Sequence, residues 1–245
     1  MGKRERLDLL LVDRQLVNSR EDGRRRILAG EVFVNDHRAT KAGVLIDARA
    51  DIRLQSTSPY VSRGGLKLEK ALREFAILVK DKTALDIGAS TGGFTDCLLA
   101  HGAARVFAID VGYGQLAWKL RKDPAVVVFE KTNIRYFDTR RLPRLADLAT
   151  IDVSFISLKV VLPHVKPLLV VRGDVIALIK PQFEVGKGKV GKGGVVRSHE
   201  EHLRVIEQIK EASAGFGYEV CGVIESPLAG PKGNKEFFIH LRSGN

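Results

Sequence analysis

The feature that most constrains the fold is a glycine-rich turn that directly follows a short apolar run. Residues 84–87 have the composition of a buried strand, and Gly88-Ala89-Ser90-Thr91-Gly92-Gly93 follows at once, before a helical pattern that begins near Phe94. Glycine lets the backbone turn tightly and approach a ligand closely at the carboxyl end of a strand. The pattern therefore predicts a strand–loop–helix unit with a ligand site at the loop.

Strand and helix patterns alternate along the chain from this first strand onward. Candidate strands lie at 84–87, 106–110, 126–129, 150–153, 175–180, 219–225 and 237–241, with helical patterns at 93–100, 115–122, 158–169 and 200–214. Such alternation implies a mostly parallel sheet covered by helices on both faces. The short connection between the last two strands predicts an antiparallel final pair. The expected fold class is α/β, a Rossmann-like seven-stranded domain.

A small α+β module is expected before this domain. Leu7, Leu10 and Leu11 have helical spacing, a second helical stretch opens at the N-cap candidate Ser19, and short strand patterns lie at 32–34 and 51–54. The segment 55–59 is polar and turn-forming, as linkers are. We therefore expect a module over 1–58, a linker over 59–64 and the larger domain over 65–245.

Charge and cysteine content narrow the class of protein. The 40 basic and 29 acidic residues give a net charge of +11, which favours a polyanionic partner because each neutralised phosphate releases counterions. Two cysteines are too few for a disulfide framework. Apolar runs are too short for a signal peptide or a membrane span. We expect a cytoplasmic protein with no membrane partner and, since the histidines lack zinc spacing, no required metal.

Acidic residues near the turn indicate its ligand. The spacing G-x-x-x-G-G departs from the dinucleotide pattern G-x-G-x-x-G, and Asp86 inside the strand would repel pyrophosphate but suits the ammonium of a methionine moiety. Asp110 ends the next strand, where a carboxylate can accept both ribose hydroxyls. Asn133 is a candidate for the adenine edge, with an ordinary polar turn residue as the equal alternative. We expect S-adenosylmethionine, held by Asp86, Gly88 to Phe94, Asp110, Asn133 and Asp152.

Two charged residues at strand ends are candidates for the reacting groups. Asp152 ends the fourth candidate strand and Lys180 ends the fifth, so both should project from the carboxyl edge of the sheet. No Pro-Pro-aromatic run follows Asp152, as amino-group methyltransferases commonly have, and neither cysteine ends a strand. Methylating a hydroxyl requires a base, a role that lysine can fill. The alternative for Asp152 and Lys180 is an ordinary ion pair at the sheet edge.

Residues 62–245 resemble the FtsJ-like ribose 2′-O-methyltransferases. Ser62-Arg63-Gly64-Gly65-Leu66-Lys67-Leu68 resembles the segment that carries the first lysine of that family's Lys-Asp-Lys-Glu tetrad, and Asn234-Lys235-Glu236-Phe237-Phe238 supplies its glutamate. The resemblance implies a tetrad of Lys67, Asp152, Lys180 and Glu236. In it Lys180 is the base, Asp152 and Lys67 tune and orient it, and Glu236 assists.

The whole chain is more similar still to the TlyA family. The segments 110–118, 152–158 and 180–196 look like that family's motifs. The resemblance implies an rRNA (cytidine-2′-O)-methyltransferase acting on rRNA or ribosomal subunits. The end of the chain soon after the last strand favours the type that modifies 23S rRNA alone, although 16S rRNA stays open as a second substrate. Members also carry the label haemolysin, which the hydropathy of this chain does not support.

The N-terminal pattern resembles the S-four-type RNA-binding domain. Its signature includes Arg6-Leu7-Asp8, Ser19-Arg20 and the segment 30–35. Arg20 and Arg24 share a helix face, since they are four residues apart. A solvated helix surface is the alternative. The expected RNA-binding residues are Arg4, Arg6, Arg20, Arg24 and Lys41, joined by Lys187 and Lys189 of a basic loop. A non-catalytic rRNA-binding or ribosome-assembly factor that retains the methyltransferase fold is the alternative function.

Overall fold

Two compact units make up the chain. The computed structural model describes residues 4–17, 19–54, 59–186, 190–191 and 193–244. One unit spans Met1–Pro59 and the other spans Tyr60–Asn245. Lys187 and Lys189, both predicted RNA contacts, lie outside the described residues. Each unit has its own apolar core and is described by itself below.

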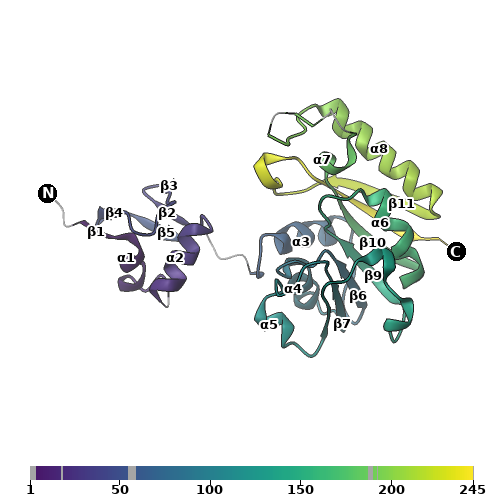
Figure 1. Cartoon of the computed structure of the whole chain (residues 1–245), viewed down its shortest axis with the longest axis horizontal. Helices are drawn as coiled ribbons and strands as arrows, with labels where there is room; N and C mark the ends of the chain where they lie inside the picture. Colours follow the sequence, from purple (N-terminus) through teal and green to yellow (C-terminus); the bar gives the residue numbers. More distant parts are fainter. Residues whose placement is uncertain (1–3, 18, 55–58, 187–189, 192, 245) are drawn as a thin grey trace. The chain divides into compact units, whose positions relative to one another are not determined.

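The first unit packs two helices against short strands (Figure 1). Its elements are β1 (Arg4–Arg6), α1 (Leu7–Asp13), α2 (Arg20–Leu28), β2 (Val32–Val34), β3 (His37–Arg38), β4 (Leu45–Asp47) and β5 (Ile52–Leu54). Ser19 caps α2 by accepting a hydrogen bond from the Asp22 N–H. Asn35 and Asp36 take the positive φ angles that a tight β2–β3 hairpin needs. Leu7, Leu11 and Ile27, all fully buried, tie both helices to the core.

The second unit is built on one seven-stranded sheet in the order β11-β12-β10-β9-β6-β7-β8. Its strands are β6 (Thr83–Ile87), β7 (Arg105–Ile109), β8 (Val126–Phe129), β9 (Ala146–Ile151), β10 (Leu169–Ile179), β11 (Tyr218–Glu225) and β12 (Phe237–Ser243). The strands β6 to β10 run parallel, and β12 inserts antiparallel between β10 and β11. The predicted fold class and the antiparallel final pair are confirmed.

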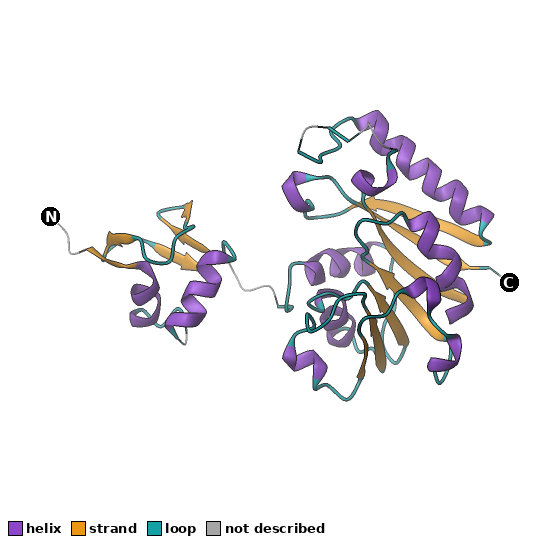
Figure 2. Ribbon diagram, viewed as in Figure 1, coloured by secondary structure: helices purple, strands orange, loops and turns teal. Residues whose placement is uncertain are grey.

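Helices cover both faces of this sheet (Figure 2). They are α3 (Gly64–Glu74), α4 (Gly93–Ala100), α5 (Trp118–Arg121), α6 (Leu158–Val165), α7 (Pro181–Glu184) and α8 (His199–Gly215), with 3₁₀ turns η1 (Ile134–Tyr136), η2 (Thr139–Arg141), η3 (Lys166–Leu168) and η4 (Pro231–Gly233). One face packs on α3 and α4 through Leu68, Leu72 and Leu98. The other packs on α6 and α8 through residues such as Val161 and Val205.

The helix prediction differs from the structure at several places: α5 is shorter than the predicted 115–122, α7 is not predicted, and two further differences have a clear cause. The helix predicted at 158–169 ends at Val165, because Pro167 cannot donate the backbone hydrogen bond that a continuing helix needs. The helix α3 lies where only a linker and a domain start are predicted from the sequence, because it opens on Gly64-Gly65, poor helix formers. A side chain at Gly65 would collide with the Tyr60 ring, so packing and not propensity selects this glycine.

The strand order reverses beside β6, and this reversal places the site. From β6 the sheet continues to β7 and β8 on one side and to β9 and β10 on the other. Ligands of open parallel sheets bind at the carboxyl ends of the strands where the order reverses. Within the part of the chain that the structure describes, no helix is long and apolar enough to cross a membrane.

Candidate active site

Two adjoining cavities lie at the carboxyl ends of β6, β7 and β9. The first has a volume of about 420 Å³ and lies between the glycine-rich loop, the start of α3 and the segment 229–232. The second, of about 450 Å³, lies between the same loop and the segments that follow β7, β8 and β9. Gly88, Ser90 and Asp152 line both. The two cavities therefore form one continuous site with Asp152 at their junction.

The glycine-rich loop forms the wall between α4 and β9. Gly88 has φ +84°, and a Cβ atom there would lie 2.4 Å from the carbonyl oxygen of Asp152. Ala89, Thr91 and Phe94 join Gly88, Ser90 and Gly93 in lining the first cavity. Gly92 lines neither cavity; it precedes α4, and a Cβ atom there would collide with Leu116 and Leu120. Six of the seven loop residues predicted to contact a ligand thus face the site.

Asp110 organises the second cavity. One of its carboxylate oxygens accepts the Ser90 N–H at 2.8 Å and the other accepts the Gly112 N–H at 2.6 Å. Asn133 also lines this cavity, and its side-chain oxygen accepts the Arg135 N–H. Gln115 lies opposite, within 3.3 Å of the Ser90 hydroxyl. No sequence signal singles out Gln115, because its contact with the loop depends on how the segment after β7 folds back.

The predicted contact between Asp86 and the ligand needs correction. Asp86 is fully buried and lines neither cavity. Its carboxylate accepts hydrogen bonds from the hydroxyls of Thr95 at 2.6 Å and Thr150 at 3.3 Å. Burial raises the pKa of Asp86 to about 7. We therefore assign Asp86 a supporting role: it joins β6, α4 and β9 beneath the loop.

Lys180 and Asp152 form a close ion pair beside the junction of the cavities. The Lys180 ammonium lies 2.5 Å from Asp152 Oδ1 and donates to the Ser154 hydroxyl at 2.9 Å. Lys180 is 9% exposed, whereas the Asp152 side chain is 25% exposed and lines both cavities. Two neighbouring strands thus bring these residues together, as their positions after β9 and at the end of β10 predict.

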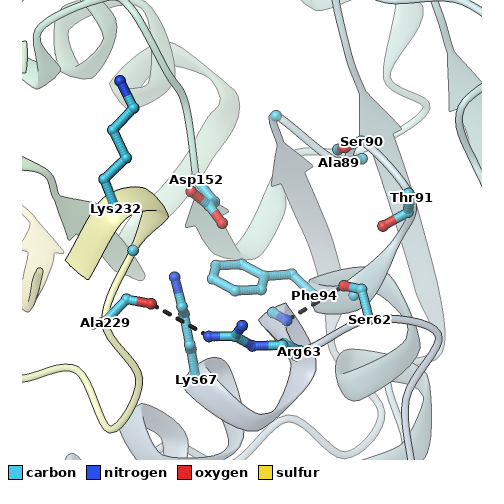
Figure 3. Close-up of a pocket in the computed structure, with 14 residues that line it drawn as sticks. Ser62, Arg63, Lys67, Ala89, Ser90, Thr91, Phe94, Asp152, Ala229 and Lys232 are labelled. Atoms are coloured by element: carbon cyan, nitrogen blue, oxygen red, sulfur yellow. Dashed lines mark hydrogen bonds between the residues drawn. The ribbon is translucent and has the colours of Figure 1, made fainter. Parts of the chain in front are cut away.

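Lys67 and Glu236 form a second ion pair across the first cavity. Their charged groups are 2.6 Å apart, and Lys67 lines the cavity from α3 while Glu236 is 1% exposed beneath it. Figure 3 shows Lys67 reaching toward the space in front of Asp152, with the Phe94 ring beside it. A Cβ atom at Gly230 would lie 1.9 Å from Glu236, so the segment before β12 closes over this carboxylate. Among the described residues, the Glu236 carboxylate pairs with Lys67.

An exposed aromatic residue stands at the rim of the second cavity. Phe155 is 91% exposed, and its backbone has φ +64°, a strained conformation for a bulky side chain. Its ring centre lies 5.0 Å from that of Phe183 in α7. The sequence alone does not indicate a binding role for Phe155, because neither the exposure of a side chain nor backbone strain can be read from a motif.

The predicted RNA-binding residues of the first unit lie at its surface. Arg4, Arg24 and Lys41 are exposed. Arg6 and Arg20 both donate to Asp8 at 2.9 Å and remain about half exposed, while Asp8 is fully buried. These hydrogen bonds, chiefly that from Arg6, lower the pKa of Asp8 to about 2. Asp8 therefore fixes two guanidinium groups side by side on one carboxylate.

Comparison with known proteins identifies close relatives. The family model described as FtsJ-like methyltransferase matches residues 60–243. A candidate rRNA methyltransferase of Bacillus subtilis is 51% identical over 98% of this chain and 86% of its own length. The 16S/23S rRNA (cytidine-2′-O)-methyltransferase TlyA of Mycobacterium tuberculosis is 44% identical over 99% and 91%. The solved structure of a candidate hemolysin from Streptococcus thermophilus has a TM-score of 0.79 at 43% identity, covering 100% and 90%.

Proposed function

Because the chain belongs to the FtsJ-like methyltransferases and, within them, to the TlyA family, we propose that it transfers a methyl group from S-adenosylmethionine to the 2′-hydroxyl of a cytidine in rRNA. The observation that carries the acceptor assignment is the Lys180–Asp152 ion pair at the junction of the two cavities. We take 23S rRNA as the main substrate, with 16S rRNA as the second, and the cytoplasm, where ribosomes work, as its location.

The two cavities fit the methyl donor. At Gly88 and Gly93 the turn has no side chain that could collide with its neighbours beside the first cavity. Asp110 lines the second cavity, where its carboxylate can accept hydrogen bonds from two ribose hydroxyls. Gly88 and Asp152 lie between that end and the cavity of Lys67. When bound, S-adenosylmethionine supplies a methyl group on a positively charged sulfur, so the protein needs only to position and deprotonate the acceptor.

In this proposal the two ion pairs, Lys180–Asp152 and Lys67–Glu236, have different roles toward the acceptor hydroxyl. The hydroxyl oxygen would bond to the methyl carbon as the methyl–sulfur bond breaks and leaves its electron pair on sulfur, and the hydroxyl proton would pass to Lys180 Nζ as a neutral amine. Asp152 holds Lys180 in place and accepts a hydrogen bond from the approaching hydroxyl. Lys67, held by Glu236, presents a positive charge that steadies the oxygen as its electron density shifts.

The N-terminal unit supplies affinity in this proposal. Arg4, Arg6, Arg20, Arg24 and Lys41 are at its surface, where guanidinium and ammonium groups can contact the phosphates of folded RNA. Such contacts set the position of the enzyme on the RNA and do not select the base.

The proposal is tested with radiolabelled S-adenosylmethionine and rRNA or isolated ribosomal subunits. We expect label in rRNA, and a ribose-methylation stop in reverse transcription at low nucleotide concentration that is absent from RNA of cells lacking the protein. Label on a base with the ribose unmodified would contradict the 2′-hydroxyl assignment. Tight rRNA binding without methyl transfer would instead support an assembly factor.

Phe155 is expected to hold the target base by stacking. Its exposed ring stands beside Asp152, where the base attached to the reacting ribose must lie. Base–aromatic stacking contributes about 1–3 kcal/mol, so Phe155→Ala should lower kcat/KM about 5-fold to 100-fold, while Phe155→Tyr retains most activity. Single-turnover methylation of rRNA measures both. Equal activity of the alanine and tyrosine variants would exclude this role for the ring.

A further inference from the structure

Three exposed aromatic side chains lie on the segments that follow β7 and β8, and these segments also contribute residues to the second cavity. Tyr113 is 71% exposed, Trp118 is 66% exposed and Tyr136 is 77% exposed. Tyr113 and Trp118 follow β7, and Tyr136 follows β8. None of them takes part in the site described above. Exposed apolar side chains on neighbouring segments commonly mark a binding surface.

Each of these rings has its own cation. The Lys131 ammonium lies 4.5 Å from the centre of the Tyr113 ring, and Lys122 lies 4.8 Å from that of Trp118. The Arg135 guanidinium lies 5.3 Å from the Tyr136 ring. Cations at these distances are attracted by the ring face. We call these three ring–cation pairs the aromatic–basic surface.

The cations of this surface are not used by the fold. Among the described residues, Lys122, Lys131 and Arg135 form no ion pair with a carboxylate. Their neighbours behave differently, since Lys119 pairs with Asp96 at 2.9 Å and Arg121 pairs with Glu130 at 2.5 Å. The nearby carboxylates of Asp96 and Glu130 therefore pair with Lys119 and Arg121. The three charges over the rings remain available to an anionic partner.

The segments that carry the aromatic–basic surface also line the second cavity. Val111 and Gln115 line that cavity from the segment that carries Tyr113, and Thr132 and Asn133 line it from the segment that carries Tyr136. Backbone hydrogen bonds from Lys131 to Gly112 and from Thr132 to Asp110 join the two segments. The aromatic–basic surface therefore adjoins, along the chain, the residues that line the cavity.

We propose that the aromatic–basic surface binds unpaired nucleotides of the RNA substrate, a statement that rests on the proposed function. Pairs of a ring and a cation match a single strand of RNA, because its bases can stack on the rings while its phosphates contact the cations. A duplex offers phosphates and 2′-hydroxyls but no free base faces. The surface thus selects RNA in which bases next to the target are already unstacked.

Trp118 provides a direct readout, because it is the one tryptophan of the chain. A single-stranded RNA of about 12 nucleotides, within the usual range of site sizes, is titrated into the full-length protein. Stacking on the indole should quench its fluorescence saturably, and a duplex of the same length should not quench it. The measurement needs no methyl transfer, so its outcome does not depend on whether the proposed reaction occurs.

Two pairs of variants separate stacking from charge. Tyr113→Ala and Tyr136→Ala should each weaken single-strand binding about 5-fold to 100-fold, whereas Tyr113→Phe and Tyr136→Phe should bind as the natural protein does. Leu78→Ala is the matched control, since Leu78 is 78% exposed and away from the surface. Equal quenching by duplex, or unchanged affinity of both alanine variants, overturns the proposal. Loss of activity on assembled subunits with unchanged RNA affinity overturns it too and points to a ribosomal protein.

Discussion

Replacing Lys180 by alanine is expected to abolish methyl transfer while leaving the cofactor site intact. Loss of a general base lowers kcat by about 10²-fold to 10⁴-fold. Among the described residues, Lys180 pairs with Asp152 and donates a hydrogen bond to the Ser154 hydroxyl, and it lines neither cavity. The affinity for S-adenosylmethionine should therefore change little. Arginine at position 180 should fail as well, because guanidinium does not release its proton near neutral pH.

The measurement is single-turnover methylation of rRNA at saturating methyl donor, with calorimetric titration of S-adenosylhomocysteine as the test of the cofactor site. Lys80→Ala is the control, because Lys80 is exposed and precedes β6, at the opposite end of that strand from Gly88. A Lys180→Ala enzyme that retains a tenth of the natural rate would show that another group accepts the proton. A loss of cofactor affinity as large as the loss of rate would show a structural role instead.

Gly88→Ala is the second substitution with a large expected effect. The new methyl group would lie 2.4 Å from the Asp152 carbonyl oxygen, at a backbone φ of +84° that alanine adopts poorly. Both partners are backbone at the carboxyl edge of the sheet, so the loop or β9 must move. A displacement of about 1 Å at a reacting centre costs about 10²-fold in rate. We expect at least this loss in kcat/KM, together with weaker S-adenosylmethionine binding.

Gly215→Ala provides the matched control for that substitution. Gly215 ends α8, and a Cβ atom there meets no other atom within 4 Å. Alanine at a helical position of this kind is neutral or stabilising by about 0.5–1 kcal/mol. Thermal unfolding and calorimetric titration of both variants decide the matter: a Gly88→Ala protein that binds S-adenosylmethionine normally would show that the close contact with Asp152 is dispensable.

The sequence predicts the sheet well because its strands are short apolar runs separated by turn residues. The five candidate strands from 84–87 to 175–180 all overlap strands of the structure, although β9 and β10 start earlier than predicted. Asp152 and Lys180 can be paired from sequence, since both lie at the carboxyl ends of strands expected in one sheet. Lys67 and Glu236 cannot be paired in this way. They are 169 residues apart, and only the family resemblance indicates that they belong together.

What the sequence misses depends on burial and on side-chain direction. Asp86 alternates with apolar neighbours in β6, and the pattern does not reveal whether its carboxylate points to the ligand or into the protein. The packing of Thr95 and Thr150 around it decides this. In the sequence, Phe155 and Trp118 cannot be told apart from apolar residues of the core. Only their exposure in the structure, 91% and 66%, distinguishes them from core residues.

The insertion of β12 between β10 and β11 has a consequence for how the enzyme is made. Glu236 and β12 are synthesised after every other strand of the sheet, and domains begin to fold while synthesis continues. A nascent chain can therefore form the donor half of its site, around Gly88 and Asp110, long before Lys67 meets its carboxylate. The long loop that this contact closes makes it one of the last to form. Catalytic competence would then arrive in a single late step, when the growing sheet receives its final strand.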